Sequence, residues 1–172
     1  MSYYPIFLGL GSNIGDREQF LKETVQSLNA SDKFQIGNIS CLYETEPKYL
    51  REQARFYNLV LEGVSELTAE NLFKFSKQIE AKSGRDFQQI RNGPREIDID
   101  ILFFTDRVIS SALLTIPHPK IEERRFVLQP ITDIAPDYVH PVKNKTMQEL
   151  LNNCSDTGQI EKIKDIKSWI SH

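Results

Sequence analysis

Asn-Gly-Pro-Arg-Glu-Ile-Asp-Ile-Asp-Ile-Leu-Phe-Phe, residues 92–104, alternates apolar and polar side chains from Ile97 onward, as a β-strand buried on one face does. Asp98 and Asp100 fall on the same face as Leu102, opposite the isoleucines. Two like charges on one strand face repel each other. Their Cβ atoms would lie about 6–7 Å apart, so that the carboxylates can converge on a hard cation such as Mg²⁺. The alternative is a solvated sheet face, and these two residues alone do not decide between the two.

The sequence on either side predicts the order strand, helix, strand, strand, helix, strand. The expected strands cover residues 5–10, 34–43, 56–64 and 97–103, and the expected helices begin at the caps Asp16 and Thr68. This order is that of a ferredoxin-like α+β fold, with a βαββαβ core, an antiparallel sheet and helices packed on one side.

Weaker patterns continue the chain beyond this core. We expect a short hairpin near residues 108–109 and short C-terminal helices near residues 120–129 and 146–151. A final amphipathic helix is expected through Ile160, Ile163 and Ile170. The expected domain is therefore residues 1–152, followed by a C-terminal tail or linker helix over residues 153–172.

Composition argues against several classes of protein. The chain has 172 residues and a formal net charge of -3, which argues against binding nucleic acid or an anionic membrane through bulk electrostatics. The apolar run at residues 6–10 is too short for a signal peptide or a membrane span, so that we expect a cytoplasmic protein. The two cysteines form no metal-binding pattern and are expected to be structural thiols.

Arginines concentrate around the acidic strand. Six of the nine lie between positions 85 and 125, and Arg95 stands just before the strand. A guanidinium binds phosphate oxygens through two parallel hydrogen bonds, so that this distribution favours a polyphosphate ligand beside a metal pair. The alternative, surface arginines paired with nearby acids, fits Arg107 and Arg125 better than it fits Arg95.

Other residues have the chemistry to recognise a ligand. His118 lies between two prolines, which hold it in an extended segment where it can contact a phosphate or a ribose. Asn58 shares a strand face with Phe56, and its amide can read the edge of a planar heterocycle while Phe56 or Phe126 stacks on the ring. A structural role remains the alternative for each residue taken singly. Residues 9–15 lack the spacing of a nucleotide-binding loop and are interpreted as a tight strand-to-helix turn.

Seven motifs follow one another along the chain. They are Gly-Leu-Gly-Ser-Asn-Ile-Gly-Asp at 9–16, Tyr-Glu-Thr-Glu-Pro at 43–47, Phe-Tyr-Asn at 56–58, Glu80 with Gly84 and Arg85, Gly-Pro-Arg-Glu-Ile-Asp-Ile-Asp-Ile-Leu at 93–102, Pro-His-Pro at 117–119 and Arg-Arg-Phe-Val-Leu-Gln-Pro at 124–130. In this order and spacing the chain resembles the 6-hydroxymethyl-7,8-dihydropterin pyrophosphokinase family of folate biosynthesis, over about residues 6–151. Two positions depart from the pattern: Asn92 stands where some members carry Trp, and Pro119 stands where some carry Tyr.

The resemblance implies a Mg²⁺-dependent ATP:pterin diphosphotransferase. Pyrophosphate would pass from ATP to the hydroxymethyl group of 6-hydroxymethyl-7,8-dihydropterin, giving the pterin diphosphate and AMP. By matching positions, Asp98 and Asp100 would hold two Mg²⁺ ions. The implied catalytic residues are Arg85, Arg95, Asp98 and Asp100; the implied ATP-binding residues are Glu80, Arg85, Arg95, His118 and Arg124; the implied pterin-binding residues are Thr45, Glu46, Pro47, Phe56, Asn58 and Phe126. The implied partners are these small molecules, with no nucleic acid and no membrane, and in some organisms the domain is fused to other folate enzymes.

Two other kinds of function remain as alternatives. A ferredoxin-like RNA-binding or ligand-regulated module would have no need for an acidic pair beside Arg95, and the sequence lacks the basic aromatic strand typical of an RNA-recognition domain. A different Mg²⁺-dependent transferase that uses Asp-x-Asp would be distinguished by its products.

Overall fold

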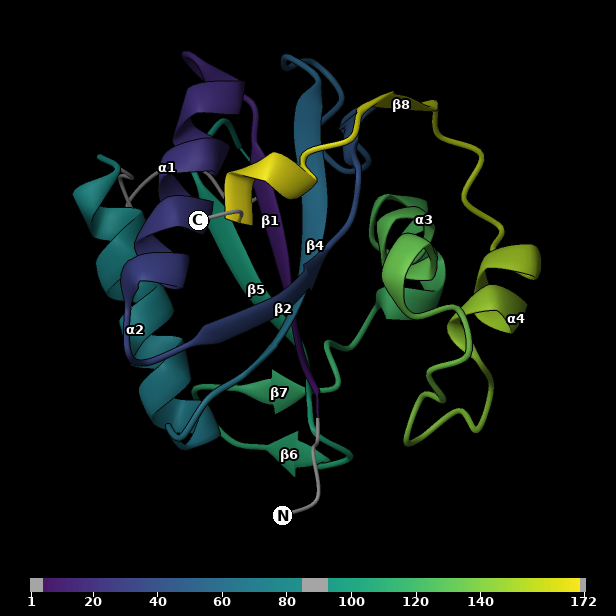
Figure 1. Cartoon of the computed structure of the whole chain (residues 1–172). Coiled ribbons are helices and arrows are strands. Elements are labelled where there is room, and N and C mark those ends of the chain that lie inside the picture. The colour runs from purple at the N-terminus through teal and green to yellow at the C-terminus, as the bar shows by residue number, and fades with distance from the viewer. Residues whose placement is uncertain (1–4, 85–92, 171–172) are drawn as a thin grey trace.

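An antiparallel sheet forms the centre of the fold (Figure 1). The computed structural model describes residues 5–84 and 93–170, and within them six strands form this sheet. They are β1 (Ile6–Ser12), β2 (Gln35–Ile39), β3 (Leu42–Thr45), β4 (Phe56–Val64), β5 (Asp98–Phe104) and β8 (Ile160–Lys164). The strand order is β5-β1-β4-β3-β8, and β2 also pairs with β4. Strand β1 therefore lies between β4 and the acidic strand β5.

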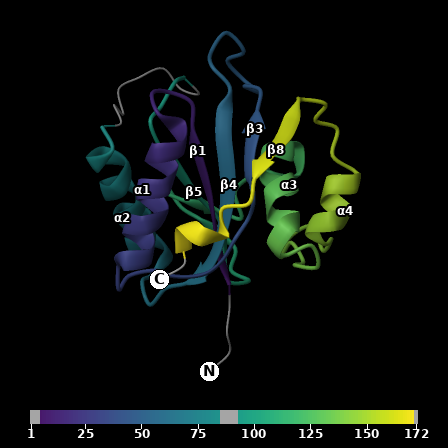
Figure 2. The same cartoon turned by 45° about the horizontal axis from the view of Figure 1, so that its top comes forward.

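Two helices, α1 (Arg17–Ala30) and α2 (Ala69–Lys82), cover one face of the sheet (Figure 2). Both begin at the predicted caps, because the side chain of Asp16 accepts an N–H of the first turn of α1 and that of Thr68 does the same for α2. Their apolar side chains are buried against the inward residues of β1 and β5 in one core cluster. The predicted βαββαβ core, with its antiparallel sheet and helices on one side, is confirmed.

The opposite face of the sheet is covered by the short helices α3 (Arg125–Ile134) and α4 (Met147–Asn152), so that the molecule has three layers (Figure 2). A short 3-10 turn, η1 (Ile121–Glu123), precedes α3. These elements pack on a second core cluster that includes Phe7 of β1 and Leu102 of β5. The short C-terminal helices expected from the sequence are thus present, and they cover only part of this face.

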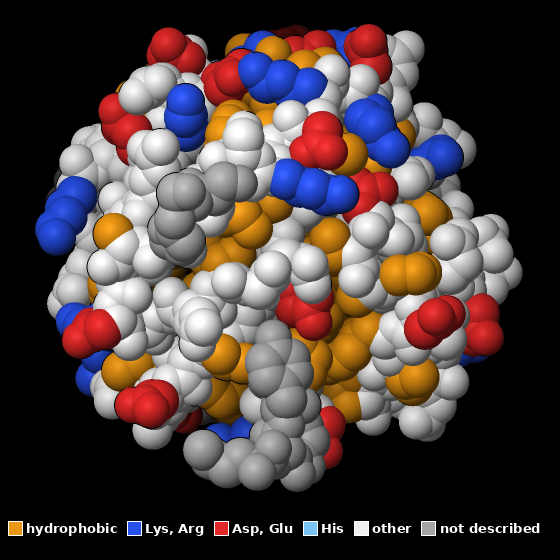
Figure 3. Space-filling view, in the orientation of Figure 1, with side chains coloured by type: hydrophobic (Ala, Val, Ile, Leu, Met, Phe, Trp, Pro, Cys, Tyr) orange, Lys and Arg blue, Asp and Glu red, His pale blue; other side chains and the backbone are white. Residues whose placement is uncertain are grey.

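The smaller features also agree with the sequence. Strands β6 (Ile109–Ser110) and β7 (Thr115–Ile116) form the expected hairpin. On the face shown in Figure 3, Lys and Arg side chains lie among Asp and Glu side chains rather than in a field of their own. In the part of the chain that the structure describes, no helix is long and apolar enough to cross a membrane.

The strand predicted over residues 34–43 is two strands, so that this prediction is wrong in one respect. The chain breaks at Ser40, whose N–H donates to the Val60 carbonyl and whose hydroxyl accepts the Val60 N–H at 2.9 Å. Cys41 then donates its N–H to the Asp133 carboxylate of α3. The alternating pattern runs through this break, because β2 and β3 both pair with β4.

The predicted terminal helix is wrong. Residues of the expected tail form strand β8, which pairs antiparallel with the open edge of β3, and only η2 (Lys167–Ile170) makes a single 3-10 turn. Isoleucines at positions 160, 163 and 166 suit a strand as well as a helix, since β-branched side chains favour extended backbone. Trp169, 7% exposed, belongs to the core cluster on the α1 side. The edge of β3, which a sequence pattern cannot show, therefore decides the conformation here.

Candidate active site

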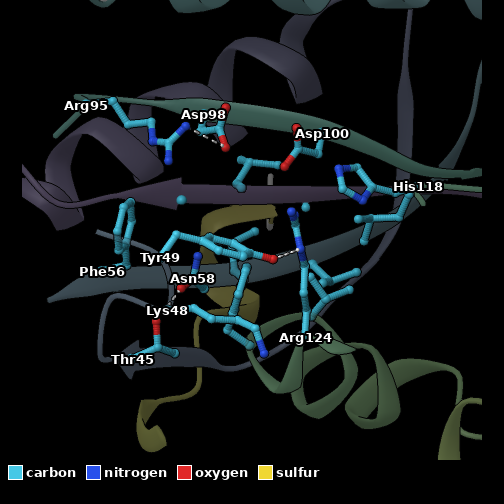
Figure 4. A pocket seen from close by; sticks show the side chains of 18 of the residues that line it. Thr45, Lys48, Tyr49, Phe56, Asn58, Arg95, Asp98, Asp100, His118 and Arg124 are labelled. Carbon is cyan, nitrogen blue, oxygen red and sulfur yellow. Dashed lines mark hydrogen bonds and ion pairs between the residues drawn. The ribbon is translucent and has the colours of Figure 1, made fainter. Parts of the chain in front are cut away.

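A cavity of about 480 Å³ opens on the α3 face of the sheet, where α3 and α4 leave the strands uncovered. Figure 4 shows Asp98 and Asp100 on one side of it and Thr45, Phe56 and Asn58 on the other. The first group projects from β5 and the second from β3 and β4, so that β1 forms the floor between them.

The floor is open because two glycines of β1 face the cavity. Gly11 pairs with Asp98 of β5 on one side and with Asn58 of β4 on the other, and Gly9 pairs with Asp100 and Val60 of the same two strands. A Cβ atom at Gly11 would lie 2.8 Å from the Asn58 side-chain nitrogen, which is closer than packed atoms approach. The interpretation of residues 9–15 as a turn is wrong for Gly9 and Gly11, which lie within β1. The signal for this role is their spacing of two, which places both on one face.

The two carboxylates are half-buried and lie close enough for their charges to interact. Burial, and next the charge of Asp98, raises the pKa of Asp100 to about 7, while Arg124 and Lys77 oppose this shift. A guanidinium nitrogen of Arg95 lies 3.5 Å from an Asp98 oxygen. The pair is therefore costly when fully ionised and is relieved by cations.

A divalent cation fits this pair. Among the described residues no group of three or more His, Cys, Asp or Glu side chains could hold a metal by itself. Mg²⁺ is commonly held by one or two carboxylates together with substrate phosphates and water. Asp98 and Asp100 match that donor set, and a bound polyphosphate would supply the remaining oxygens.

Glu80 supports the acidic strand from behind. Its side chain is fully buried, and one oxygen accepts the Ile99 N–H at 2.7 Å, between the two aspartates in sequence. The other oxygen pairs with Lys77 at 3.0 Å. Burial raises the pKa of Glu80, and the charge of Lys77 opposes the rise. Glu80 is not part of the cavity lining, whereas Lys77 of the same helix is.

The wall opposite the carboxylates is built to present an amide. The Thr45 hydroxyl donates to the Asn58 side-chain oxygen at 2.7 Å, which leaves the amide nitrogen of Asn58 over Gly11. Phe56 and Phe126 also line the cavity. Hydrogen-bond donors and acceptors next to aromatic rings are suited to a planar heterocycle.

His118 and Arg124 lie at the far end of the cavity (Figure 4). Burial, and then the charge of Arg124, lowers the pKa of His118 to about 4, so that the imidazole is neutral at pH 7. Its Nδ1 has no hydrogen-bond partner among the described residues. The Arg124 Nε donates to the Tyr49 hydroxyl at 2.9 Å, and its guanidinium lies over the Tyr49 and Phe126 rings. This end can hold an anion beside an unpaired ring nitrogen.

The sequence profile of the family described as 7,8-dihydro-6-hydroxymethylpterin-pyrophosphokinase (HPPK) matches residues 7–136. The chain belongs to this family. The resemblance inferred from the seven motifs is thus confirmed.

Relatives of this HPPK-family chain fall into short and long proteins. The 2-amino-4-hydroxy-6-hydroxymethyldihydropteridine pyrophosphokinase of Aquifex aeolicus is 38% identical over 144 residues, which cover 84% of this chain and 88% of the relative. The folic acid synthesis protein FOL1 of Dictyostelium discoideum is 40% identical over 158 residues, which cover 92% of this chain and 24% of that protein. The chain thus spans about a quarter of the length of its longer relatives.

A solved structure supports the same fold. A crystal structure of a triple mutant of Plasmodium falciparum HPPK-DHPS matches with a TM-score of 0.72 at 19% identity, covering 88% of this chain and 43% of that chain. At this identity the likeness concerns the fold.

Most residues expected to form the HPPK site come together in the cavity. The lining contains Thr45, Glu46, Phe56, Asn58, Arg95, Asp98, Asp100, His118, Arg124 and Phe126. Pro47 lies instead in a small adjoining hollow, and Glu80 stands behind β5. Arg85 lies outside the described residues.

Sequence reasoning missed several polar residues in or beside the HPPK-family site, among them Lys48, Tyr49, Gln53, Lys77 and Asn13. Lys48 and Lys77 line the cavity, and no local pattern separates them from surface lysines. Asn13 is 3% exposed; its side-chain oxygen accepts the Arg95 N–H at 2.9 Å and its side-chain nitrogen donates to Gln53 at 2.8 Å. Asn13 therefore joins the start of the acidic segment to the loop before β4, and its position inside the first motif was the available signal.

Proposed function

We propose that this HPPK-family chain transfers pyrophosphate from ATP to the hydroxymethyl group of 6-hydroxymethyl-7,8-dihydropterin, giving the pterin diphosphate and AMP. The observation that carries the proposal is one cavity that joins the carboxylates of Asp98 and Asp100 to the amide of Asn58 across a glycine floor. A polyphosphate and a planar heterocycle can thus meet within a single site.

The transfer makes one bond and breaks one. The hydroxymethyl oxygen attacks the β-phosphorus of ATP, the bond between this phosphorus and the oxygen of the α-phosphate breaks, AMP leaves and the hydroxyl proton is released. Such a reaction depends on positioning and charge neutralisation more than on a strong base. The cavity offers cations and hydrogen-bond donors for both tasks.

We propose that Asp98 and Asp100 hold two Mg²⁺ ions. When bound, Mg²⁺ would neutralise phosphate charge and stabilise the attacking and leaving oxygens. Arg95 and Arg124 would bind phosphate oxygens from two sides, and His118 would contact ATP through its neutral ring. Glu80 would act on the nucleotide site through the β5 backbone. A phosphate role for Arg85 remains part of the proposal.

The opposite wall is proposed to bind the pterin. Phe56 and Phe126 would stack on the two sides of the ring, and Asn58 would read its edge. The backbone of residues 45–47 would complete this recognition. The hydrogen bond from Thr45 to Asn58 supports the assignment, because it fixes which amide atom is presented.

We further propose that the catalytic domain is residues 1–152, with residues 153–172 as an addition that supports it. We also propose that the protein acts in folate biosynthesis and that it is cytoplasmic. It would act beside other folate enzymes, or joined to one of them as the name "folate synthesis bifunctional protein" of some longer relatives indicates.

Product analysis tests the function. The purified protein is incubated with ATP, Mg²⁺ and 6-hydroxymethyl-7,8-dihydropterin, and products are identified by mass spectrometry and phosphorus NMR. We expect AMP and the pterin diphosphate in equal amounts, with no free pyrophosphate, and no reaction after chelation of Mg²⁺. Release of free pyrophosphate with an adenylated acceptor would indicate a nucleotidyltransferase instead.

A further inference from the structure

The carboxylate of Asp156, outside the cavity, joins the segments that form the wall proposed to bind the pterin. Asp156 lies between α4 and β8, and its side chain is 11% exposed. One of its oxygens accepts the Arg125 N–H at 3.1 Å and lies 3.5 Å from the Lys48 ammonium. The other accepts the Gly158 N–H at 2.9 Å. A single side chain thus connects three separate segments.

The first of these contacts acts on helix α3. Arg125 is its first residue, directly before Phe126 and directly after Arg124. The residue at the cap position, Arg124, makes no side-chain cap hydrogen bond, so that Asp156 caps the helix from a distant part of the chain. An acid at a helix N-terminus satisfies an open N–H and interacts favourably with the helix dipole.

The second contact acts on the loop after β3. Lys48 lines the cavity, and its ammonium also donates to the Glu123 carbonyl just before α3. Burial opposes the ionisation of Asp156, but the two backbone N–H groups and the Lys48 charge outweigh it and lower the pKa of Asp156. An ionised carboxylate therefore holds the loop against the start of α3.

The residues that follow Asp156 extend this attachment to the rest of the wall. The Gln159 carbonyl accepts the Glu46 N–H at 3.1 Å, and Ile160 of β8 pairs with Thr45 of β3 (Figure 2). Thr45 in turn orients Asn58. The family profile ends at residue 136, before any of these C-terminal contacts.

We propose that Asp156 is a positioning residue for the pterin end of the cavity. By binding the first N–H of α3 and the ammonium of Lys48, it sets the separation between Phe126 and the wall of Thr45 and Glu46. The inference rests on the proposed function, because it takes the planar ligand to be the pterin. Among the described residues, the hydrogen bonds and the ion pair of Asp156 reach neither His118 nor the β5 carboxylates at the nucleotide end. Arg124, which also lies at that end, is reached only through the backbone of its neighbour Arg125.

The test compares Asp156→Ala and Asp156→Asn with a matched control. The control is Lys164→Gln, which removes the ion pair between Lys164 of β8 and Glu18 of α1. Lys164 belongs to the same C-terminal segment as Asp156 but does not line the cavity. Calorimetry measures binding of 6-hydroxymethyl-7,8-dihydropterin and, separately, of Mg²⁺ with α,β-methylene-ATP. Steady-state assays measure kcat and the KM for each substrate.

We expect Asp156→Ala to weaken pterin binding about tenfold, as loss of a cap and an ion pair would do, with nucleotide binding changed less than about twofold. Its KM for pterin should rise more than kcat falls. Asp156→Asn, which keeps one acceptor oxygen, should recover part of the affinity, and Lys164→Gln should bind both ligands as the wild type does.

Unchanged pterin affinity in Asp156→Ala, or equal losses for pterin and nucleotide, would overturn the positioning role. If Asp156→Ala does not fold, the same criteria apply to Asp156→Asn. If the wild-type protein binds no pterin, the proposed function itself is refuted. This outcome differs from failure of the positioning role, because it is measured on the wild type before any substitution is made.

Discussion

The same face of the sheet is a hydrophobic core at one end and a polar cavity at the other. At the core end, Phe7 of β1, Val60 of β4 and Leu102 of β5 pack beneath α3 and α4. The next residues on the same face, two positions further along β1, β4 and β5, are Gly9, Asn58 and Asp100. The strands keep the same partners between the two ends, although the register of β1 with β5 shifts between Phe7 and Leu8.

The difference lies in what covers the sheet. Side chains of α3 and α4 fill the core end, where the ring of Phe103 lies 4.9 Å from that of Tyr138. Beyond the start of α3, the strands project glycine, amide and carboxylate groups into open space. A single set of strands can thus supply stability at one end and ligand chemistry at the other, because alternate residues keep the same face.

Removal of either carboxylate should have the largest effect, and it should act on function alone. We expect Asp98→Ala and Asp100→Ala each to lower turnover on the order of 10⁴-fold, about 5 kcal/mol, because a ligand of the proposed metal pair is lost. The melting temperature without ligand should be unchanged or slightly higher, since one of two repelling charges is gone. Turnover assays and melts with and without Mg-nucleotide measure both, and near wild-type turnover would refute the metal assignment.

Truncation of a buried side chain at the core end should lower stability and leave ligand binding by the folded protein intact. Phe103 is fully buried, and Phe103→Ala should lower the free energy of unfolding by about 3–5 kcal/mol through lost burial and the resulting cavity. Urea denaturation measures the loss, and calorimetry checks that the remaining folded protein still binds an ATP analogue. A loss of the same size in Asp100→Ala would show that the two ends are not separable.

Asn58→Ala tests the wall of the cavity nearest the core. Pterin binding should weaken by about 1–3 kcal/mol, because ligand groups are left without partners, while binding of an ATP analogue changes little. Isothermal calorimetry on each ligand gives both values. Equal losses for the two ligands would indicate that the substitution disturbs the whole site.

His140 provides the smallest test, at the core end. Its Nδ1 accepts the N–H groups of Val142 and Lys143 at 3.1 Å each, and its ring lies 5.3 Å from that of Phe103. Burial lowers the pKa of His140; Lys143 adds to this and Glu122 opposes it.

The neutral ring is therefore the form that the folded state favours. Its contribution is complete above the unfolded pKa of about 6.5 and is lost as the pH falls through the folded pKa. Between pH 7 and pH 5, the free energy of unfolding should therefore fall more steeply in the wild type than in His140→Asn. Protonation of His118 also destabilises the folded protein at low pH, but it does so equally in the wild type and in His140→Asn. If the melting temperatures of the two proteins fall in parallel with pH, His140 does not contribute to the pH dependence.

The sequence was sufficient wherever a local pattern reports a local structure. Asp16 and Thr68 cap their helices as expected, and the alternation around Asp98 and Asp100 places both carboxylates in the cavity. The distance between Asn58 and these acids cannot be read from the sequence. The resemblance to the family nevertheless predicted that all three residues belong to one site.

The failures come from partners distant in sequence. The break at Ser40 depends on hydrogen bonds to Val60, and the strand at Ile160 depends on the free edge of β3. Likewise, Gly9 and Gly11 form the cavity floor only because β4 and β5 flank them. A pattern within a short stretch of sequence does not show which distant segments will lie next to it.

The hydrogen bond between Glu80 and Ile99 also bears on how the protein stays apart from its own copies. Strand β5 is the last strand at its end of the sheet, and the outer backbone groups of such a strand can pair with another chain and begin aggregation. Glu80 already occupies the Ile99 N–H, and the His118 N–H already occupies the Leu102 carbonyl at 3.0 Å. The contacts that hold the acidic strand in place thereby leave fewer free groups on which a foreign strand could dock.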